Sequence, residues 1–333
     1  MKVEFTDRHI LKVVDLDVKF YTYAGVVEAV SKVSFDVYRN EIVALVGETG
    51  SGKTVSTRAI TRLIDSPGRI EGGSVLFRRR NGGIVDLLSL PDEEIRKIRG
   101  DEIAYIFQDP TSALDPLYTI GVHIAETVRD HRTVSGRVLR DLAIKLLRDV
   151  AIPNPEIRYK SYPHEMSGGM RQRSVIAISL SNTPILLVAD EPTTNLDVTI
   201  QAQILDMIRD LVKSRGMSTI LVTHNLGVVA ETADRVYVMY AGKIAEHGGV
   251  YDIFEKPSHP YTQMLLRAVP NPMRKITKLE SIPGTIPTLV NPPRGCRFHP
   301  RCPFAMDVCR REEPPLVEVE KGHFASCWLH VKR

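Results

Sequence analysis

The chain has few of the features that mark membrane-spanning, secreted or polyanion-binding proteins. Its longest uncharged apolar stretch, between Arg173 and Asp190, is interrupted by Ser, Asn, Thr and Pro, whereas a spanning helix needs about 20 predominantly apolar residues. The N-terminus carries early acidic residues and no apolar signal core, which argues against secretion. With 44 Lys plus Arg against 40 Asp plus Glu, the net charge of +4 is too mild to indicate nucleic acid or an anionic membrane. We therefore expect a cytoplasmic protein without a transmembrane segment.

Cysteine is missing from most of the chain: all four cysteines lie beyond residue 295. Elsewhere the composition is that of an ordinary globular protein, with 43% hydrophobic and 25% charged residues. At about 150 residues per domain, 333 residues predict two domains. Proline becomes dense between Pro257 and Pro315. We therefore predict a first domain over residues 1–255 and a small irregular C-terminal module over 256–333.

The hydrophobic pattern predicts strands that alternate with helices. Alternation with period two over 11–37, and short apolar runs at 41–46, 185–189, 219–222 and 235–239, favour strands. Residues 92–99 and 121–150 instead carry apolar residues three and four apart, which favours helices. Such alternation is typical of an α/β fold with a mainly parallel sheet.

A glycine-rich loop follows the predicted strand at 41–46. The segment Gly47–Thr54 fits the pattern G-x-x-x-x-G-K-[ST] after a strand, the context that a phosphate-binding loop requires. Lys53 is expected to reach the β- and γ-phosphates of ATP, and Thr54 to bind Mg²⁺. The alternative is a glycine-rich turn without a ligand. The expected ATP-binding residues of this segment are Gly47, Thr49, Gly50, Ser51, Gly52, Lys53, Thr54 and Val55.

An acidic pair, Asp190 and Glu191, ends the apolar run at 185–189. An Asp at such a strand end can hold Mg²⁺ through its water shell, and the next Glu can polarise the attacking water. Taken alone, such a pair is often only a helix cap or a surface charge. Beside a phosphate loop it favours nucleotide hydrolysis.

The segment Met166–Arg173 (MSGGMRQR) resembles the signature motif of ATP-binding cassette (ABC) ATPases. Gln108, the segment Thr194–Asp197 and His224 stand in the order that the same family shows. The resemblance implies a P-loop NTPase cassette made of a β-subdomain, a RecA-like core and a helical subdomain at about 109–165.

The resemblance also implies roles for particular residues. Glu191 is the expected general base. His224 is expected to contact the γ-phosphate and order the attacking water, and Gln108 is expected to sense Mg²⁺ and water. Mg²⁺ is expected at Thr54, Gln108 and Asp190. Asp197 is expected to bridge two cassettes, and Tyr23, rather than Tyr21, to stack on adenine. The signature residues expected to bind the ATP of the opposite subunit are Ser167, Gly168, Gly169 and Met170.

The cysteines Cys296, Cys302, Cys309 and Cys327 are separated by five, six and seventeen residues. Their spacing leaves three interpretations open: two disulfides, a structural Zn²⁺ site or a four-thiolate iron–sulfur cluster. Disulfides are disfavoured in the cytoplasm, and the spacing is wider than that of zinc ribbons. Neighbouring arginines are expected to offset the negative charge of a cluster; these are Arg294, Arg297, Arg301, Arg310 and Arg311.

The sequence around these cysteines resembles the C-terminal tail of dipeptide and oligopeptide importer ATPases, and so do the upstream segments HPYTQMLL and IPGTIP. This resemblance implies a [4Fe–4S] cluster with a structural role, with Zn²⁺ as the alternative.

Together these resemblances imply the ATP-hydrolysing subunit of a peptide importer, peripheral at the cytoplasmic face of the cell membrane. The implied partners are a paralogous ABC ATPase, two transmembrane permease subunits and an extracytoplasmic solute-binding protein, with no nucleic acid. Importers of oligosaccharides or nickel are alternatives. A soluble ABC protein of repair or translation fits poorly, because the interval from Lys53 to Ser167 is too short for a coiled-coil insertion and the chain holds one cassette. An iron–sulfur regulatory protein would not need Glu191 and His224 together.

Overall fold

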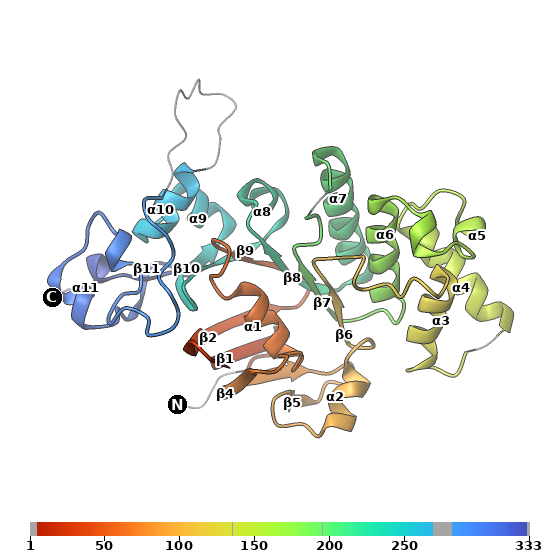
Figure 1. The fold of residues 1–333 in the computed structure, drawn as a ribbon, viewed down its shortest axis with the longest axis horizontal. Helices are drawn as coiled ribbons and strands as arrows, with labels where there is room; N and C mark the ends of the chain where they lie inside the picture. Colours follow the sequence, from red (N-terminus) through yellow and green to blue (C-terminus); the bar gives the residue numbers. More distant parts are fainter. Residues whose placement is uncertain (1–4, 135, 195, 269–281, 332–333) are drawn as a thin grey trace.

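The computed structural model describes residues 5–134, 136–194, 196–268 and 282–331, whose strands form two sheets (Figure 1). The smaller sheet is antiparallel, in the order β2-β1-β4-β5. Its strands are β1 (His9–Thr22), β2 (Gly25–Tyr38), β4 (Gly68–Arg78) and β5 (Ile84–Asp86). The alternation predicted over 11–37 is confirmed as the long β1–β2 pair, whose inward side chains such as Leu11 and Val33 are fully buried.

The larger sheet runs in the order β11-β12-β10-β9-β3-β8-β7-β6. The strands from β9 to β6 are parallel, as predicted, and β10, β12 and β11 continue the sheet antiparallel. Because the parallel strands share one direction, their carboxyl ends meet at one edge, where ligands of such sheets bind. The strands are β3 (Ile42–Val46), β6 (Ile103–Ile106), β7 (Leu186–Asp190), β8 (Ser218–Thr223), β9 (Arg235–Tyr240), β10 (Lys243–Gly249), β11 (Leu316–Glu320) and β12 (His323–Ser326).

Helices flank the central sheet, and several gather at one end of the molecule beyond β6 and β7 (Figure 1). Within the predicted helical subdomain, α4 packs against α3 and α6. Its apolar positions Leu139, Ala143 and Leu147 are buried, as their spacing predicted. The helices are α1 (Lys53–Ile60), α2 (Asp92–Ile98), α3 (Ile120–Arg129), α4 (Gly136–Asp149), α5 (Pro155–Arg158), α6 (Gly168–Ser179), α7 (Val198–Arg215), α8 (Leu226–Thr232), α9 (Val250–Glu255), α10 (Pro260–Arg267) and α11 (Asp307–Arg311), with short 3-10 turns η1 (Pro163–Glu165), η2 (His299–Arg301) and η3 (Trp328–His330).

The C-terminal segment joins the same sheet and core as the rest of the chain. Strand β12 pairs with β10, and β11 pairs with β12. Tyr261 and Phe298 are buried in one apolar cluster with Val46 and Tyr240. The change in composition near residue 255 therefore coincides with no gap in packing, because the apolar side chains that follow it are covered by the cassette. The division into 1–255 and 256–333 stays a prediction.

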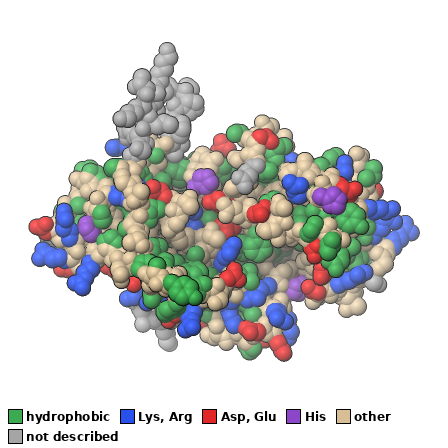
Figure 2. Space-filling view, in the orientation of Figure 1, with side chains coloured by type: hydrophobic (Ala, Val, Ile, Leu, Met, Phe, Trp, Pro, Cys, Tyr) green, Lys and Arg blue, Asp and Glu red, His purple; other side chains and the backbone are tan. Residues whose placement is uncertain are grey.

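None of the helices in the described ranges combines the length and the apolar character that a membrane crossing requires. On the face shown in Figure 2, basic and acidic side chains are interspersed over most of the surface, in keeping with the small net charge.

Candidate active site

The phosphate-loop sequence connects β3 to α1, and its glycines are required by the backbone. Gly47 and Gly52 have φ of 150° and 103°, in the region that favours glycine. A Cβ at Gly47 would lie 2.2 Å from the carbonyl oxygen of Met239, and one at Gly52 would lie 2.6 Å from that of Ala29. At these two positions the loop thus packs against backbone with no room for a side chain. Its N–H groups and the start of α1 form the kind of concavity that binds phosphate.

Lys53 is buried at the foot of this loop. Its ammonium donates hydrogen bonds to the carbonyl oxygens of Gly47 at 2.9 Å and Glu48 at 3.0 Å. Burial lowers its pKa, while the carboxylates of Glu191, Asp190 and Glu48 act in the opposite direction. The cation therefore stays within the loop, where three acidic groups of the site offset the cost of its burial.

Thr54 and Asp190 meet as the sequence predicted. The Thr54 hydroxyl donates to Asp190 Oδ1 at 2.9 Å, and the hydroxyl of Tyr105 donates to Oδ2 at 2.8 Å. Burial raises the pKa of Asp190, and the hydrogen bonds from Tyr105 and Thr54 partly oppose that rise. A hydroxyl beside a carboxylate is a donor set that suits Mg²⁺, a cation that prefers oxygen ligands and keeps several waters. The sequence analysis missed Tyr105, whose only signal was its place three residues before Gln108.

Glu191 is the centre of a second cluster at the same sheet edge. Its Oε2 accepts hydrogen bonds from Gln108 Nε2 and the Thr194 hydroxyl, both at 2.9 Å. Its Oε1 lies 3.1 Å from Nδ1 of His224. The predicted catalytic residues thus converge on one carboxylate, and Thr194 joins them. Gln108 contacts Glu191 rather than Asp190 or Thr54, so its predicted place among the Mg²⁺ ligands stays untested.

The backbone at Glu191 is strained, with φ of 46° in a residue other than glycine. Its N–H donates to the carbonyl oxygen of Val222 at 2.9 Å, which anchors this turn to strand β8. The chain therefore turns sharply directly after β7, and the Glu191 side chain faces Gln108 and His224.

The signature residues form the start of α6. The Ser167 hydroxyl caps this helix and accepts from the N–H of Met170 at 3.3 Å. Gly168 and Gly169 are the first helical residues, and a Cβ at Gly169 would lie 3.1 Å from Cγ2 of Ile200. Across the described ranges, no hydrogen bond or ion pair connects Ser167–Met170 to the phosphate loop of the same chain.

Two other predicted residues are exposed. Asp197 caps α7, accepting from the N–H of Ile200 at 3.0 Å, and its carboxylate lies at the surface. Tyr23 lies in the turn between β1 and β2 and is fully exposed. The hydroxyl of Tyr21, the second choice for stacking, donates to Glu71 at 2.8 Å. Tyr23 therefore keeps an exposed ring, whereas Tyr21 is held against its own sheet.

The four cysteines line one small cavity together with Phe298 and Trp328. All are free thiols, so the structure gives no support to the disulfide interpretation. Burial raises the pKa of Cys296 and of Cys327 to about 11. Across the described ranges, no group of three or more His, Cys, Asp or Glu side chains is arranged to hold a metal ion. Four thiols around one cavity are nonetheless the donor set of a cluster; the cluster itself belongs to the proposals below.

Two of the arginines beside the cysteines, Arg297 and Arg301, pair with carboxylates of the cassette, and the predicted role of all five arginines stays untested. Arg297 donates to the carbonyl oxygen of Ala241 at 2.6 Å and pairs with Glu28. Arg301 pairs with Glu48 through two hydrogen bonds of 2.8 Å and 3.1 Å. Because these carboxylates lie on the cassette, both guanidinium groups are turned toward it and already paired. Arg294, Arg310 and Arg311 are exposed.

Comparison with known proteins identifies the family to which the chain belongs. Residues 30–194 match the family model described as ABC transporter, and residues 245–309 match that of the oligopeptide/dipeptide transporter C-terminal region. A probable peptide ABC transporter ATP-binding protein of Sinorhizobium fredii is 48% identical, over 96% of this chain and 94% of its own length. The chain belongs to the ABC transporter ATP-binding proteins. The Lactococcus lactis dipeptide transport ATP-binding protein DppD is also 48% identical, over 97% of this chain and 91% of its own length.

Solved structures confirm the predicted cassette fold. A dimeric ATP-binding cassette, MJ0796, in a post-hydrolysis state bound to ADP and Pi, superposes with a TM-score of 0.64 at 25% identity, covering 72% of this chain and 98% of its own. CbiO1 of Clostridium perfringens superposes with a TM-score of 0.60 at 24% identity, covering 75% of this chain and 92% of its own. ATP binding and hydrolysis are therefore the activity of this ABC protein.

Proposed function

We propose that this ABC protein hydrolyses ATP to drive the uptake of dipeptides or oligopeptides. The observation that carries the proposal is the convergence of Gln108, Thr194 and His224 on Glu191, beside the Thr54–Asp190 pair. The match of its C-terminal region and the names of its relatives in Sinorhizobium and Lactococcus support peptides as the transported class.

The residues of the site divide the chemistry between them. Backbone N–H groups of Gly47–Thr54 and the Lys53 ammonium bind the phosphates of ATP, and Tyr23 stacks on adenine. Thr54 and Asp190 would hold Mg²⁺, which would supply positive charge against the charge that develops on the phosphate oxygens. Glu191 accepts a proton from the attacking water, and the hydrogen bonds from Gln108 and Thr194 fix its carboxylate in place. His224 orients Glu191 from the other side.

The signature surface requires a second cassette. Within the described part of the chain, no hydrogen bond or ion pair joins the helix start capped by Ser167 to this chain's own phosphate loop, and Asp197 is exposed at the start of the neighbouring helix α7. We therefore propose that Ser167, Gly168, Gly169 and Met170 bind the ATP of an opposite subunit, a paralogous ABC ATPase. Two transmembrane permease subunits and an extracytoplasmic solute-binding protein complete the complex. This chain lies at the cytoplasmic face of the cell membrane.

Uptake by the reconstituted complex tests the transported class. The chain is assembled in liposomes with its paralogue, permease subunits and binding protein, and uptake of a labelled dipeptide and a labelled pentapeptide is compared with that of an oligosaccharide and of Ni²⁺. ATP-dependent uptake of a peptide alone supports the proposal. Uptake of only the sugar or the metal overturns the peptide assignment and leaves the ATPase standing.

For the cysteine cavity we propose a [4Fe–4S] cluster bound by Cys296, Cys302, Cys309 and Cys327, with structural Zn²⁺ as the alternative. A cluster would cross-link three segments that otherwise share little secondary structure. Protein purified without oxygen is expected to contain about four iron and four sulfide per chain. Zinc without iron would favour the alternative, and a reversible redox signal that changes the ATPase rate would contradict a purely structural role.

A further inference from the structure

The C-terminal segment holds the phosphate loop at one residue, Glu48. The Glu48 backbone N–H donates to the hydroxyl of Tyr261 at 2.9 Å. Its carboxylate accepts from both terminal nitrogens of Arg301, at 2.8 Å and 3.1 Å. Backbone and side chain of one loop residue are thus fixed by two residues far along the chain, and neither belongs to a nucleotide motif.

The Arg301 side chain is also held in place by contacts outside the phosphate loop. Its side chain is only 5% exposed, and its Nε donates to the carbonyl oxygen of Pro283 at 2.9 Å. Its guanidinium carbon lies 5.8 Å from the ring centre of Tyr240. Paired twice and buried, the group has little freedom to leave Glu48, and a bidentate pair of this kind is both strong and directional.

Tyr261 is equally constrained. It lies at the start of α10, where the His259 ring caps the helix by accepting from the Tyr261 N–H at 3.0 Å. Its ring is fully buried, with ring centres 4.7 Å from Tyr240 and 5.4 Å from Phe298. The hydroxyl that meets Glu48 is therefore placed by the His-Pro-Tyr sequence and by the aromatic core around it.

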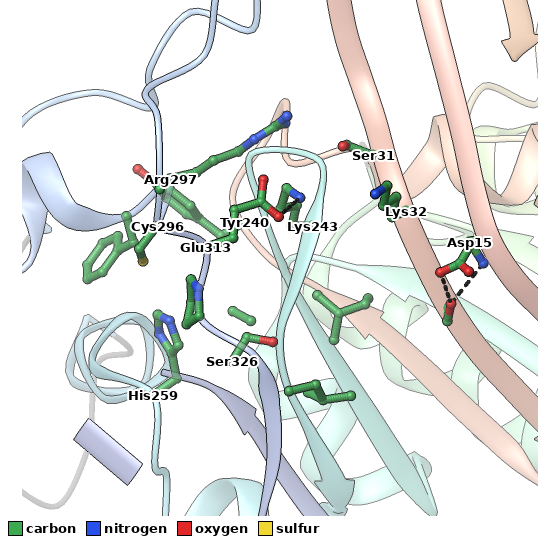
Figure 3. A pocket seen from close by; sticks show the side chains of 17 residues that line it. Asp15, Ser31, Lys32, Tyr240, Lys243, His259, Cys296, Arg297, Glu313 and Ser326 are labelled. Carbon is green, nitrogen blue, oxygen red and sulfur yellow. Dashed lines mark hydrogen bonds and ion pairs between the residues drawn. The ribbon is translucent and has the colours of Figure 1, made fainter. Parts of the chain in front are cut away.

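A second connection supports the same loop through the turn after β9. Arg297 donates to the carbonyl oxygen of Ala241, and the neighbouring Gly242 N–H donates to the carbonyl oxygen of Ser51 at 2.9 Å. Figure 3 shows Arg297 beside Cys296 and Tyr240 at the wall of a cavity of about 290 Å³, between the C-terminal segment and the cassette. Of the two arginines that flank cysteines, Arg301 thus contacts the loop directly, and Arg297 supports it indirectly through Ala241 and Gly242.

The contacts of Glu48 are expected to affect ATP binding through electrostatics. A carboxylate inside a phosphate loop repels the polyphosphate unless a cation neutralises it. Arg301 supplies that cation. We propose that Arg301 and Tyr261 are positioning residues that neutralise Glu48 and hold the phosphate loop in its ATP-binding shape. This inference rests on the proposed ATP site at Gly47–Thr54.

The test is a double-mutant cycle on the pair, R301Q, E48Q and R301Q with E48Q, read as the Kd for MgATP and as KM and kcat of hydrolysis. R301Q is expected to raise the Kd about tenfold, with kcat changed less than about twofold, because Glu48 then stands unneutralised. E48Q alone is expected to tighten binding, and the double variant to recover most of the lost affinity. R310Q, which removes an exposed arginine of the same segment, is the control and binds as the wild type does.

Either of two results overturns the inference. R301Q that binds MgATP as tightly as the wild type shows that the pair does not serve the loop. A double variant as weak as R301Q shows that Arg301 acts only by holding the segment together. Y261F keeps the buried ring and is expected to raise the Kd about threefold, an effect that loss of packing would not explain. Wild-type protein that binds no MgATP overturns the proposed site, and with it this inference.

Discussion

The phosphate-loop edge and the cysteine cavity use ionisable residues in opposite ways. At the sheet edge, Glu191 and His224 contact one another, and the carboxylates of Glu191, Asp190 and Glu48 oppose the effect of burial on the pKa of Lys53. Around the cysteines, burial raises the pKa of Cys296 to about 11 and lowers that of His259 to about 4. The first region keeps charged groups ready for a charged substrate. In the second, burial keeps the Cys296 thiol and the His259 ring neutral, and His259 serves as a helix cap.

The contrast predicts that substitutions in the two regions affect different properties, namely the rate of ATP hydrolysis and the stability of the fold. Substitutions at the sheet edge should lower the rate of hydrolysis and leave the fold intact, since these side chains lie on rigid strand ends. Substitutions around the C-terminal segment should destabilise the protein first, because each buried polar group there balances another. Glu48 connects the two regions, through Arg301 and Tyr261.

The largest effect is expected from Glu191→Gln. The amide keeps the shape of the side chain but cannot accept a proton from water, so hydrolysis should fall by about 10² to 10⁴-fold. MgATP binding and the unfolding midpoint should stay near wild type. Phosphate release and nucleotide affinity measure the two effects, with the exposed Glu231→Gln on α8 as the control. Turnover that survives in Glu191→Gln would show that another group is the base.

The second prediction concerns Glu246, which is fully buried against His323 at 2.7 Å. Burial opposes its ionisation, but hydrogen bonds from His323 and from the backbone N–H groups of Ser258 and His259 outweigh it and hold its pKa below the ordinary value. Glu246→Gln breaks this pair and should cost about 3 kcal/mol of unfolding free energy.

Denaturant unfolding measures that loss, and steady-state hydrolysis at saturating ATP should change less than about twofold. The matched control is Glu320→Gln, whose carboxylate pairs with Lys256 at the surface and should matter little. If Glu246→Gln lowered turnover without lowering stability, the division between the two regions would be wrong.

The residues of the sheet edge are recognisable from the sequence, whereas the contacts of the C-terminal segment are not, for a physical reason. Asp190 and Glu191 stand at the end of a strand with a recognisable apolar pattern, and Lys53 stands at the start of the helix that follows a glycine-rich loop, so their neighbours follow from sheet topology. Arg301 and Tyr261 reach Glu48 across more than half the chain, and periodicity does not encode such a pairing. The arginines were therefore assigned to the cysteines, their nearest neighbours in sequence. Strands β4, β5, β6, β10, β11 and β12 are outside the predicted set, and the last three contain no buried apolar run like those of β3 and β7.

The third prediction concerns pH. Burial lowers the pKa of both His247 and His259 to about 4, so the folded protein keeps them neutral while the unfolded chain protonates them near 6.5. Their stabilisation is therefore complete above about pH 6.5 and is lost as the pH falls toward 4. His259→Asn retains a side-chain acceptor for the α10 cap without the titration. It should remove roughly half of the histidine-dependent fall in unfolding midpoint between pH 7.5 and 5. An unchanged pH slope would exclude His259 as a contributor.

The smallest effect is expected from Tyr105→Phe, which removes a hydrogen bond inside the catalytic region. Its hydroxyl donates to Asp190 at 2.8 Å and lies 3.0 Å from the Thr57 hydroxyl. Without it, Asp190 keeps only the Thr54 partner and its carboxylate is less well oriented. The Mg²⁺ concentration for half-maximal hydrolysis should rise about threefold, a loss in the range of one net hydrogen bond. Tyr118→Phe, at an exposed position, is the control. Tyr105 is partly buried, so the same variant also tests whether the division between turnover and stability follows burial or position in the fold. If the unfolding midpoint falls and the Mg²⁺ requirement does not change, the burial of a residue, rather than its place at the catalytic edge, determines whether its substitution affects stability. The catalytic edge would then differ from the cysteine cavity only in how much of it is exposed.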